Sequence, residues 1–320
     1  MKDIYEKIFE TGIIPVVVID DADDALPIAK ALCDGGLPAA EITFRTAAAA
    51  ESIRRIAKEY GDKMLVGAGT VLTEEQAQAA IDAGAQFIVS PGFSENIVRY
   101  CIEKGVTVIP GCSRPTDVEA AIRLGLSVVK FFPAEAAGGL AMIKAMSAPY
   151  SNMRFMPTGG IDEKNLNDYL AFHKIIACGG SFMVKKDWIQ KKEFEKITES
   201  CRKAVKLMHG FCVEHVGINA DTRENADPIL AAFAPFGFDV HEGKESIFLN
   251  HDVEIMTKPW YGKNGHICVQ TNNIKRAEAY LKSKGVKFIE ESKNIGPNGD
   301  YAAVYIDGDV NGFAVHLLQK

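Results

Sequence analysis

The sequence predicts an α/β protein, with a (β/α)8 barrel over residues 1–208 and a smaller α+β domain of two βαβββ modules over residues 211–320. Three observations lead to this prediction. Eight short apolar runs alternate with amphipathic stretches in the first 200 residues, the pattern changes beyond Gly210, and the remainder contains an internal repeat. A chain of 320 residues is also long enough for two domains.

The eight apolar runs predict the strands of the barrel: residues 13–19, 39–44, 64–69, 86–92, 106–111, 127–133, 153–160 and 174–180. Strands that alternate with helices form a parallel sheet covered by helices. A doubly wound sheet more often has fewer strands, so eight units favour closure into a barrel of the TIM type.

Between these runs, the helix starts and ends carry their own signals. Thr73 with Gln76, and Thr116 with Glu119, read as capping boxes, in which side chains satisfy the first free amides of a helix. Helix ends are predicted at three glycines, Gly84, Gly105 and Gly125. A charged amphipathic segment, residues 191–210, closes the barrel region.

Beyond the barrel, the sequence repeats itself. The stretch "HVGINADTRENADPILAAFAPFGFDV" (215–240) is similar to "HICVQTNNIKRAEAYLKSKGVKF" (266–288), and each copy leads to a further strand, at 252–256 and 313–318. Each module of about 50 residues is too small to fold alone, so we expect the two to build one domain together.

Charge and cysteine content limit the class of protein. The net charge is −6 without a basic run, so neither nucleic acid nor an acidic membrane is expected as a partner. The first residues lack a signal-peptide pattern. The seven cysteines form no C-x-x-C pair and read as reduced thiols, which predicts a cytoplasmic protein.

The lysine of "SVVKFFPAE" (127–135) stands in a predicted buried strand near the barrel mouth, where the chemistry of such barrels takes place. Lys130 could extend its ammonium to solvent, or it could be kept neutral by desolvation and act as a nucleophile that forms a Schiff base with a ketone. Glu41, Thr43 and Arg45 share one face of another strand, so Glu41 and Arg45 are expected near Lys130. An ion pair between Glu41 and Arg45 is the simpler alternative for both.

Two glycine pairs follow the seventh and eighth predicted strands, in "PTGGI" (157–161) and "CGGS" (178–181). Barrels of this type often bind phosphate with the loops after these two strands, because glycine lets backbone amides approach an anion. Ordinary turn formation is the alternative, but two pairs at these two strands favour a phosphate site.

Six motifs in this order, "EITFRT", "GAGTVL", "SPGF", "VVKFFPAE" followed by "GG", "PTGGI" and "GGSFMV", closely resemble the class I 2-keto-3-deoxy-6-phosphogluconate (KDPG) and 4-hydroxy-2-oxoglutarate (KHG) aldolase family. The resemblance covers roughly residues 1–205. It implies a carbon–carbon lyase that needs no metal or other cofactor, because the substrate is held as a covalent Schiff base. It also implies a homotrimer assembled through the barrels.

The resemblance assigns the site residues. Lys130 would form the Schiff base and Glu41 would be the general acid and base. The substrate-binding residues would be Arg45 and Thr70 for the carboxylate, Phe132 for the pyruvyl part, and Gly159, Gly160 and Ser181 for the phosphate.

Two further expectations concern details of this site. A water molecule is expected between Lys130 and Glu41, because the two groups must not neutralise each other permanently. Arg114 stands where the family usually has a small or hydroxyl residue, and its charge could alter the preferred distal group of the substrate.

These assignments predict cleavage of KDPG to pyruvate and glyceraldehyde 3-phosphate, cleavage of KHG to pyruvate and glyoxylate, or both. A related 2-keto-3-deoxy sugar acid is the alternative substrate. A second alternative is another phosphate-binding barrel enzyme, such as an epimerase or synthase. That class would not need Lys130, Glu41 and Arg45, so these residues favour the aldolase.

The region 211–320 resembles a vicinal-oxygen-chelate (glyoxalase-like) domain through "HVGI", "VEIM", "GHICV" and "NGFAVHLL". In metal-binding members, the first and last strands of each module supply a ligand, which here implies His215, Glu254, His266 and His316 and a divalent ion such as Zn, Ni, Fe or Mn. The family more often has glutamate in place of His316. The alternative is a module without metal, which binds a metabolite or sets the assembly.

Overall fold

The computed structural model describes residues 3–297 and 299–320. The chain divides into two compact units, residues 1–208 and 209–320, each with its own sheet.

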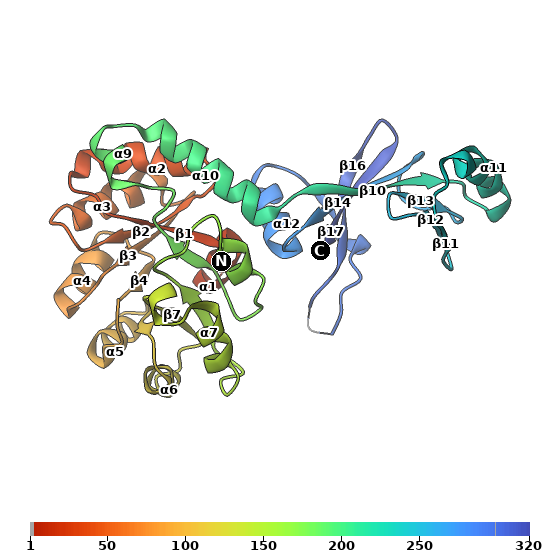
Figure 1. The fold of residues 1–320 in the computed structure, drawn as a ribbon. Helices are drawn as coiled ribbons and strands as arrows, with labels where there is room; N and C mark the ends of the chain where they lie inside the picture. The colour runs from red at the N-terminus through yellow and green to blue at the C-terminus, as the bar shows by residue number, and fades with distance from the viewer. Residues whose placement is uncertain (1–2, 298) are drawn as a thin grey trace. The chain divides into compact units, whose positions relative to one another are not determined.

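The first unit is built on parallel strands that curl into a barrel (Figure 1). They are β1 (Ile13–Val17), β2 (Ala39–Thr43), β3 (Leu65–Gly69), β4 (Phe87–Val89), β5 (Thr107–Ile109), β6 (Gly111–Cys112), β7 (Val128–Phe131), β8 (Arg154–Pro157) and β9 (Cys178–Gly180). One run of neighbours is β5-β4-β3-β2-β1-β9 and the other is β6-β7-β8.

Two links close the barrel. The bridges Phe155–Ile175 and Thr158–Gly179 join β8 to the segment of β9. Pro110 alone separates β5 from β6, so these two strands form one of the eight predicted segments, interrupted where proline cannot donate a hydrogen bond. The predicted barrel is thereby confirmed.

Helices cover the outside of the barrel (Figure 1). They are α1 (Ile4–Thr11), α2 (Ala25–Asp34), α3 (Ala49–Tyr60), α4 (Glu74–Asp82), α5 (Glu95–Glu103), α6 (Pro115–Arg123), α7 (Gly139–Ser147), α8 (Leu166–Leu170), α9 (Lys186–Gln190) and α10 (Phe194–His209), with short 3-10 turns at 22–24 and 135–137. Inside, a cluster of buried apolar side chains from successive strands fills the barrel core, among them Ile14, Phe87, Val128 and Met156.

The predicted cap of α4 is confirmed, because the Gln76 amide donates to the Thr73 hydroxyl at 3.2 Å. The cap predicted for α6 at Thr116 is wrong. The helix begins at Pro115, whose fixed φ and missing N–H suit the first helical position, and Arg114 is the N-cap. The predicted end glycines Gly84, Gly105 and Gly125 all have positive φ, between 68° and 96°.

The second unit contains the two predicted βαβββ modules. The first is β10 (Cys212–Asn219), α11 (Arg223–Phe233), β11 (Val240–Glu242), β12 (Ser246–Leu249) and β13 (Val253–Met256); the second is β14 (Gly265–Thr271), α12 (Ile274–Ser283), β15 (Phe288–Ile289), β16 (Ala303–Val310) and β17 (Phe313–Gln319). They share one eight-stranded sheet in the order β11-β12-β13-β10-β14-β17-β16-β15.

Each module has its own apolar core between helix and sheet. Ile247, Leu249 and Ile255 belong to the core of the first module, and Val304 and Leu317 to that of the second. Because successive side chains of a strand point to opposite faces, Glu254 and His316, which precede Ile255 and Leu317, lie on the other face of the sheet.

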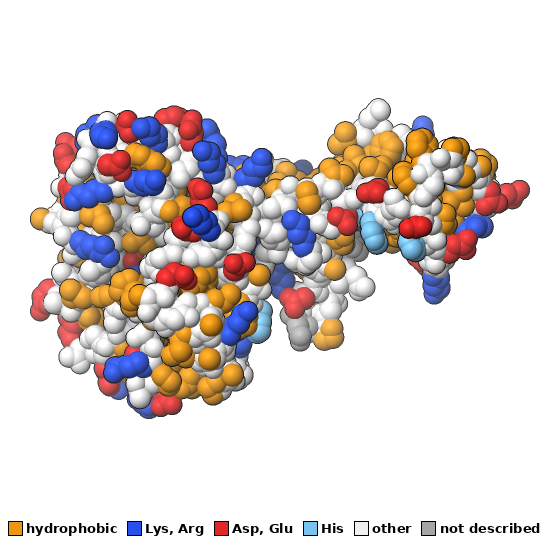
Figure 2. Space-filling view, in the orientation of Figure 1, with side chains coloured by type: hydrophobic (Ala, Val, Ile, Leu, Met, Phe, Trp, Pro, Cys, Tyr) orange, Lys and Arg blue, Asp and Glu red, His pale blue; other side chains and the backbone are white. Residues whose placement is uncertain are grey.

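Within the described residues, the helices are too short or too polar to cross a lipid bilayer. Figure 2 shows acidic and basic side chains interspersed over the face that it draws. That face therefore carries no large patch of a single charge, in keeping with the mixed composition.

Candidate active site

A buried lysine and a buried glutamate meet inside the barrel. Lys130 lies on β7 and Glu41 on β2, and the Lys130 Nζ atom is 3.1 Å from Glu41 Oε1. Lys130 is 5% exposed and Glu41 is fully buried, so the reading of Lys130 as an amine extended into solvent is wrong. The predicted water between them is also wrong, because the two groups touch directly.

Glycine creates the space that Glu41 occupies. A Cβ atom at Gly69 would lie 2.2 Å from Glu41 Oε1, closer than any non-bonded contact allows. The second carboxylate oxygen, Oε2, is buried without a hydrogen-bond partner among the described residues. Glu41 therefore has one oxygen on Lys130 and one that is free to bind a substrate atom or a water molecule.

A cavity of about 520 Å³ opens at the C-terminal ends of the strands. Its wall contains five of the predicted substrate-binding residues: Arg45, Phe132, Gly159, Gly160 and Ser181. Lys130 and Glu41 are not part of this wall. Lys130 nevertheless lies close to a residue of the wall, since its Nζ atom is 5.3 Å from the centre of the Phe132 ring.

Arg45 does not pair with Glu41, as the simpler interpretation required. Its Nε atom donates to the hydroxyl of Thr70 at 3.3 Å, so the two residues predicted to hold the substrate carboxylate lie side by side. Thr70 has a positive φ of 56°, an uncommon backbone conformation for threonine.

The glycines of the predicted phosphate loop have positive φ, 98° at Gly159 and 84° at Gly160. A Cβ at Gly160 would lie 2.5 Å from Glu135 Cγ, so this residue meets both a backbone and a packing requirement. The turn alternative thus accounts for the glycines themselves. It does not account for their convergence with Ser181 on one cavity wall.

Two residues of the cavity were not identified from the sequence. Thr158, immediately before the glycine pair, is 6% exposed, and its hydroxyl has no partner among the described residues. Lys186 also lines the cavity, and its Nζ is 2.9 Å from Asp20 Oδ2. The position of Thr158 inside "PTGGI" was a usable signal, whereas Lys186 follows a strand end by several residues and has no motif of its own.

Comparison with known proteins places the chain in a family. The family model described as KDPG and KHG aldolase matches residues 4–200. The chain belongs to the KDPG and KHG aldolase family. Enzymes of this family are carbon–carbon lyases.

Individual proteins that are similar to the chain have names of the same family. The chain is similar to a 2-dehydro-3-deoxy-phosphogluconate aldolase of Treponema pallidum, with 47% identity over 65% of this chain and 99% of that protein. It is 42% identical to the KHG/KDPG aldolase of Escherichia coli K12 over 64% of this chain and 96% of the relative. A crystal structure of the KDPG aldolase of Legionella pneumophila, with pyruvate captured as a covalent carbinolamine, aligns with a TM-score of 0.61 at 35% identity over 63% of this chain and 98% of that one.

Arg114, where the chain departs from the family pattern, does not line the cavity of the aldolase barrel. Its side chain is 74% exposed and pairs with Asp117 at 3.0 Å. The expectation that its charge acts on the distal part of the substrate is therefore not supported by its position.

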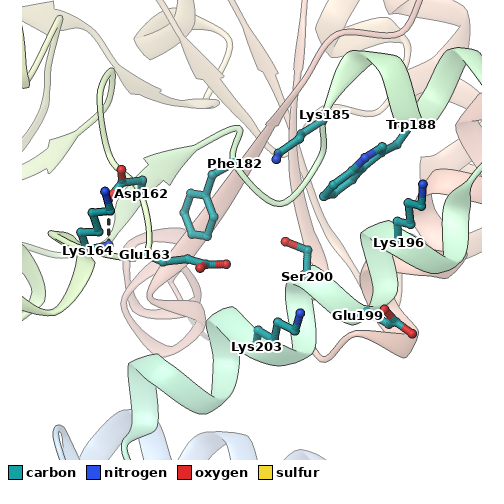
Figure 3. A pocket seen from close by; sticks show the side chains of 10 residues that line it. All are labelled: Asp162, Glu163, Lys164, Phe182, Lys185, Trp188, Lys196, Glu199, Ser200 and Lys203. Carbon is teal, nitrogen blue, oxygen red and sulfur yellow. Dashed lines mark hydrogen bonds between the residues drawn. The ribbon is translucent and has the colours of Figure 1, made fainter.

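A second cavity, of about 420 Å³, lies beside the first in the aldolase barrel and shares Phe182 and Lys185 with it (Figure 3). Phe182, Lys185 and Trp188 extend into it from the segment after β9, opposite Ser200 and Lys203 of α10 (Figure 3). Its wall contains four lysines and three acidic side chains, so the cavity favours neither anionic nor cationic ligands.

In the second unit, three of the predicted metal ligands converge. His215 Nε2 lies 3.2 Å from His266 Nε2, and Glu254 Oε2 lies 3.4 Å from His215 Nε2 and 3.1 Å from His266 Nε2. Although burial opposes ionisation, hydrogen bonds with His215, His266 and Ser246 hold the pKa of Glu254 well below its usual range. A carboxylate and two imidazoles at these distances are a donor set that fits a divalent cation.

His316, the fourth predicted ligand, lies near two of the others. Its ring centre is 5.9 Å from that of His215 and 5.1 Å from that of His266. Burial and the neighbouring His266 and His215 lower the pKa of His316 to about 4, so the ring is neutral and able to bind a metal. Its Nε2 atom is buried without a partner among the described residues.

Proposed function

We propose that the barrel is a class I aldolase that cleaves KDPG to pyruvate and glyceraldehyde 3-phosphate, KHG to pyruvate and glyoxylate, or both. The direct contact between Lys130 Nζ and Glu41 Oε1 is the observation that carries this proposal. The relatives' names support the same two substrates. The carbinolamine in the related Legionella enzyme supports covalent catalysis.

The first half of the reaction forms the Schiff base. Glu41 accepts a proton from Lys130 across 3.1 Å, which leaves a neutral amine. The amine attacks the C2 carbonyl of the substrate, and Glu41 returns a proton so that the carbinolamine loses water. The resulting iminium cation is an electron sink next to C3.

The second half breaks the C3–C4 bond. Glu41 accepts the proton of the C4 hydroxyl, the bonding electrons move into the iminium, and the aldehyde departs from the enamine. Protonation at C3 and hydrolysis then release pyruvate and restore Lys130. Arg45 with Thr70 would orient the carboxylate, since guanidinium binds carboxylates in two-point geometry.

Borohydride trapping tests this mechanism. With pyruvate present, reduction should add a stable pyruvyl mass to the peptide that contains Lys130, and the Lys130→Arg variant should neither be labelled nor cleave substrate. Label on another lysine of an active enzyme would contradict the assignment. Release of pyruvate from a panel of phosphorylated and unphosphorylated 4-hydroxy-2-keto acids would rank KDPG, KHG and related sugar acids.

We further propose that residues 211–320 form a vicinal-oxygen-chelate domain that binds a divalent ion through His215, Glu254, His266 and His316. The convergence of these side chains and the unpartnered His316 Nε2 support it. When bound, such an ion acts as a Lewis acid or as a cross-link of the sheet. Metal analysis of the purified protein should find about one ion per chain, and the His266→Ala variant should lose it while the aldolase remains active.

The remaining proposals concern location and assembly. The seven cysteines are thiols rather than disulfides and Cys212 alone among them is exposed, which supports the predicted cytoplasmic location. A trimer remains the assembly that the family resemblance implies. Light scattering on the full chain, and on a chain ended after Gly210, would measure it and reveal whether the second domain sets the assembly instead.

A further inference from the structure

A cysteine lies between two of the histidines in the second unit. His215 of β10 pairs with Cys268 of β14, and Cys268 pairs with His316 of β17. Directly opposed residues on neighbouring strands point to the same face. A ring nitrogen of each histidine and the Cys268 Sγ atom all lie within 4.8 Å of one another.

The two modules differ at the position two residues after the first histidine, which is Gly217 in β10 and Cys268 in β14. A Cβ at Gly217 would lie 2.1 Å from the His266 ring. Because glycine has no Cβ, the ring has room to extend over β10 and contact Glu254. In the other module the corresponding place holds a sulfur. The first module therefore brings a histidine and a carboxylate to the cluster, and the second brings two histidines and a thiol.

Hydrogen bonding is incomplete in both triads, since among the described residues His266 Nδ1 and His316 Nε2 are both buried without a partner. His316 is 6% exposed, and its Nε2 has no partner among the described residues. A buried polar atom without a partner is destabilising, and a bound ligand would relieve this cost. Cys268 itself is fully buried, so its sulfur is directed at the cluster rather than at solvent.

We propose that Cys268 is a metal ligand, acting as a thiolate together with His215 and His316. The inference rests on the metal site proposed above and extends it with a donor of different chemistry. Binding replaces the thiol proton with the ion and releases one proton for each ion bound. Thiolate and imidazole together select Zn²⁺ or Co²⁺ over Mg²⁺, Ca²⁺ and Mn²⁺, which prefer oxygen ligands.

This donor set indicates what the ion does. Two triads, His215 with Glu254 and His266, and His215 with Cys268 and His316, share one histidine and offer five donors. A catalytic zinc ion usually takes three ligands from the protein and leaves a position open, whereas a structural zinc ion takes four. With a fourth donor from the neighbouring triad, the ion would stabilise the second unit and have no open position for a substrate.

Cobalt spectroscopy on the full chain tests this inference. After chelation and reconstitution with Co²⁺, the wild type should show a sulfur-to-cobalt charge-transfer band in the near ultraviolet as well as visible bands of low symmetry. Cys268→Ser should keep the visible bands, lose the ultraviolet band and bind Co²⁺ at least about tenfold more weakly. Cys212→Ser is the matched control, because Cys212 is exposed and belongs to neither triad, and it should retain both bands.

A measurement without substitution covers the case in which Cys268→Ser does not fold. X-ray absorption of the zinc-loaded wild type should contain a zinc–sulfur distance of about 2.3 Å. Cobalt binding without the charge-transfer band, or a zinc shell of nitrogen and oxygen alone, would overturn the role of Cys268 and leave the histidine site standing. No binding of either ion would overturn both, and aldolase activity measured in the same samples reports on the barrel separately.

Discussion

Gly69 offers the most direct test of how the barrel positions its acid and base. Replacement by alanine places a Cβ atom 2.2 Å from Glu41 Oε1, whereas ordinary contacts begin at 3.4 Å, so the oxygen must retreat by about 1.2 Å. The backbone at Gly69 is not left-handed, so alanine meets no conformational barrier there. The displaced oxygen is the one that contacts Lys130.

A displacement of about 1 Å in a catalytic group can reduce a rate by about 100-fold, equivalent to about 2.7 kcal/mol in the barrier. We expect Gly69→Ala to lower kcat by about this factor. KM should change little, because Arg45 and the glycine loop are not touched. The assay couples pyruvate release to lactate dehydrogenase, and pyruvate with borohydride should still label Lys130.

Extra volume in a packed interior costs about 1–3 kcal/mol of stability, so circular dichroism must first establish that the variant is folded. Gly92→Ala is the matched control. A Cβ there meets nothing within 4 Å, and kcat should be unchanged. A folded Gly69→Ala enzyme with kcat within about threefold of the wild type would refute the proton-relay role of Glu41 at its observed position.

Three further predictions follow. Thr158→Val should leave stability unchanged or slightly higher, because the buried hydroxyl has no partner among the described residues, yet kcat/KM should fall roughly tenfold if that hydroxyl binds substrate. Lys186→Gln should raise KM for phosphorylated substrates roughly tenfold and leave KHG unaffected, because it removes a cation from the cavity wall that also carries the glycine pair. Burial, and secondarily Arg276, lower the pKa of His209 to about 4, so its folded form stays neutral while the unfolded chain takes up a proton below about pH 6.5. Stability should thus fall as pH falls, by about 2 kcal/mol between pH 7 and pH 5, and His209→Phe should remove that part of the slope in urea unfolding.

The strands of both units could be predicted because their signals are local. Apolar runs of five to eight residues, and glycines at helix ends, report on the few residues around them. The start of α6 was misplaced because Thr116 matched a capping pattern, while Pro115 directly before it was the stronger signal. Two local patterns predicted different helix starts, and the helix begins at Pro115, whose φ is fixed by its ring.

The meeting of Lys130 and Glu41, 89 residues apart, could be predicted only as proximity. Strand-end position and side-chain alternation place both at the barrel mouth. They do not reveal that the two groups touch without an intervening water. That contact depends on the room beside Gly69, and a glycine inside a strand looks the same in sequence whether it serves a close approach or a bend.

Cys268 was missed for a related reason. In sequence it is one buried thiol among seven, and its place between His215 and His316 follows from the register of three strands. That register includes a shift between Val213 and His215, which moves His215 opposite Cys268. A slip of one residue would send the thiol to the opposite face, so no reading of spacing alone could have assigned it.

The lysine–glutamate site of the barrel and the histidine cluster of the second unit share one structural feature, a glycine beside a buried polar side chain. In both sites a buried polar side chain reaches a partner on another strand through space left by a position that lacks a Cβ. Gly69 gives this space to Glu41, and Gly217 gives it to the ring of His266. Each glycine stands beside a group that would be costly to bury alone, and each permits a contact that compensates it, Glu41 with Lys130 and His266 with Glu254. A glycine within a predicted strand, next to a strand that carries a buried charge, is therefore informative about function as well as about shape.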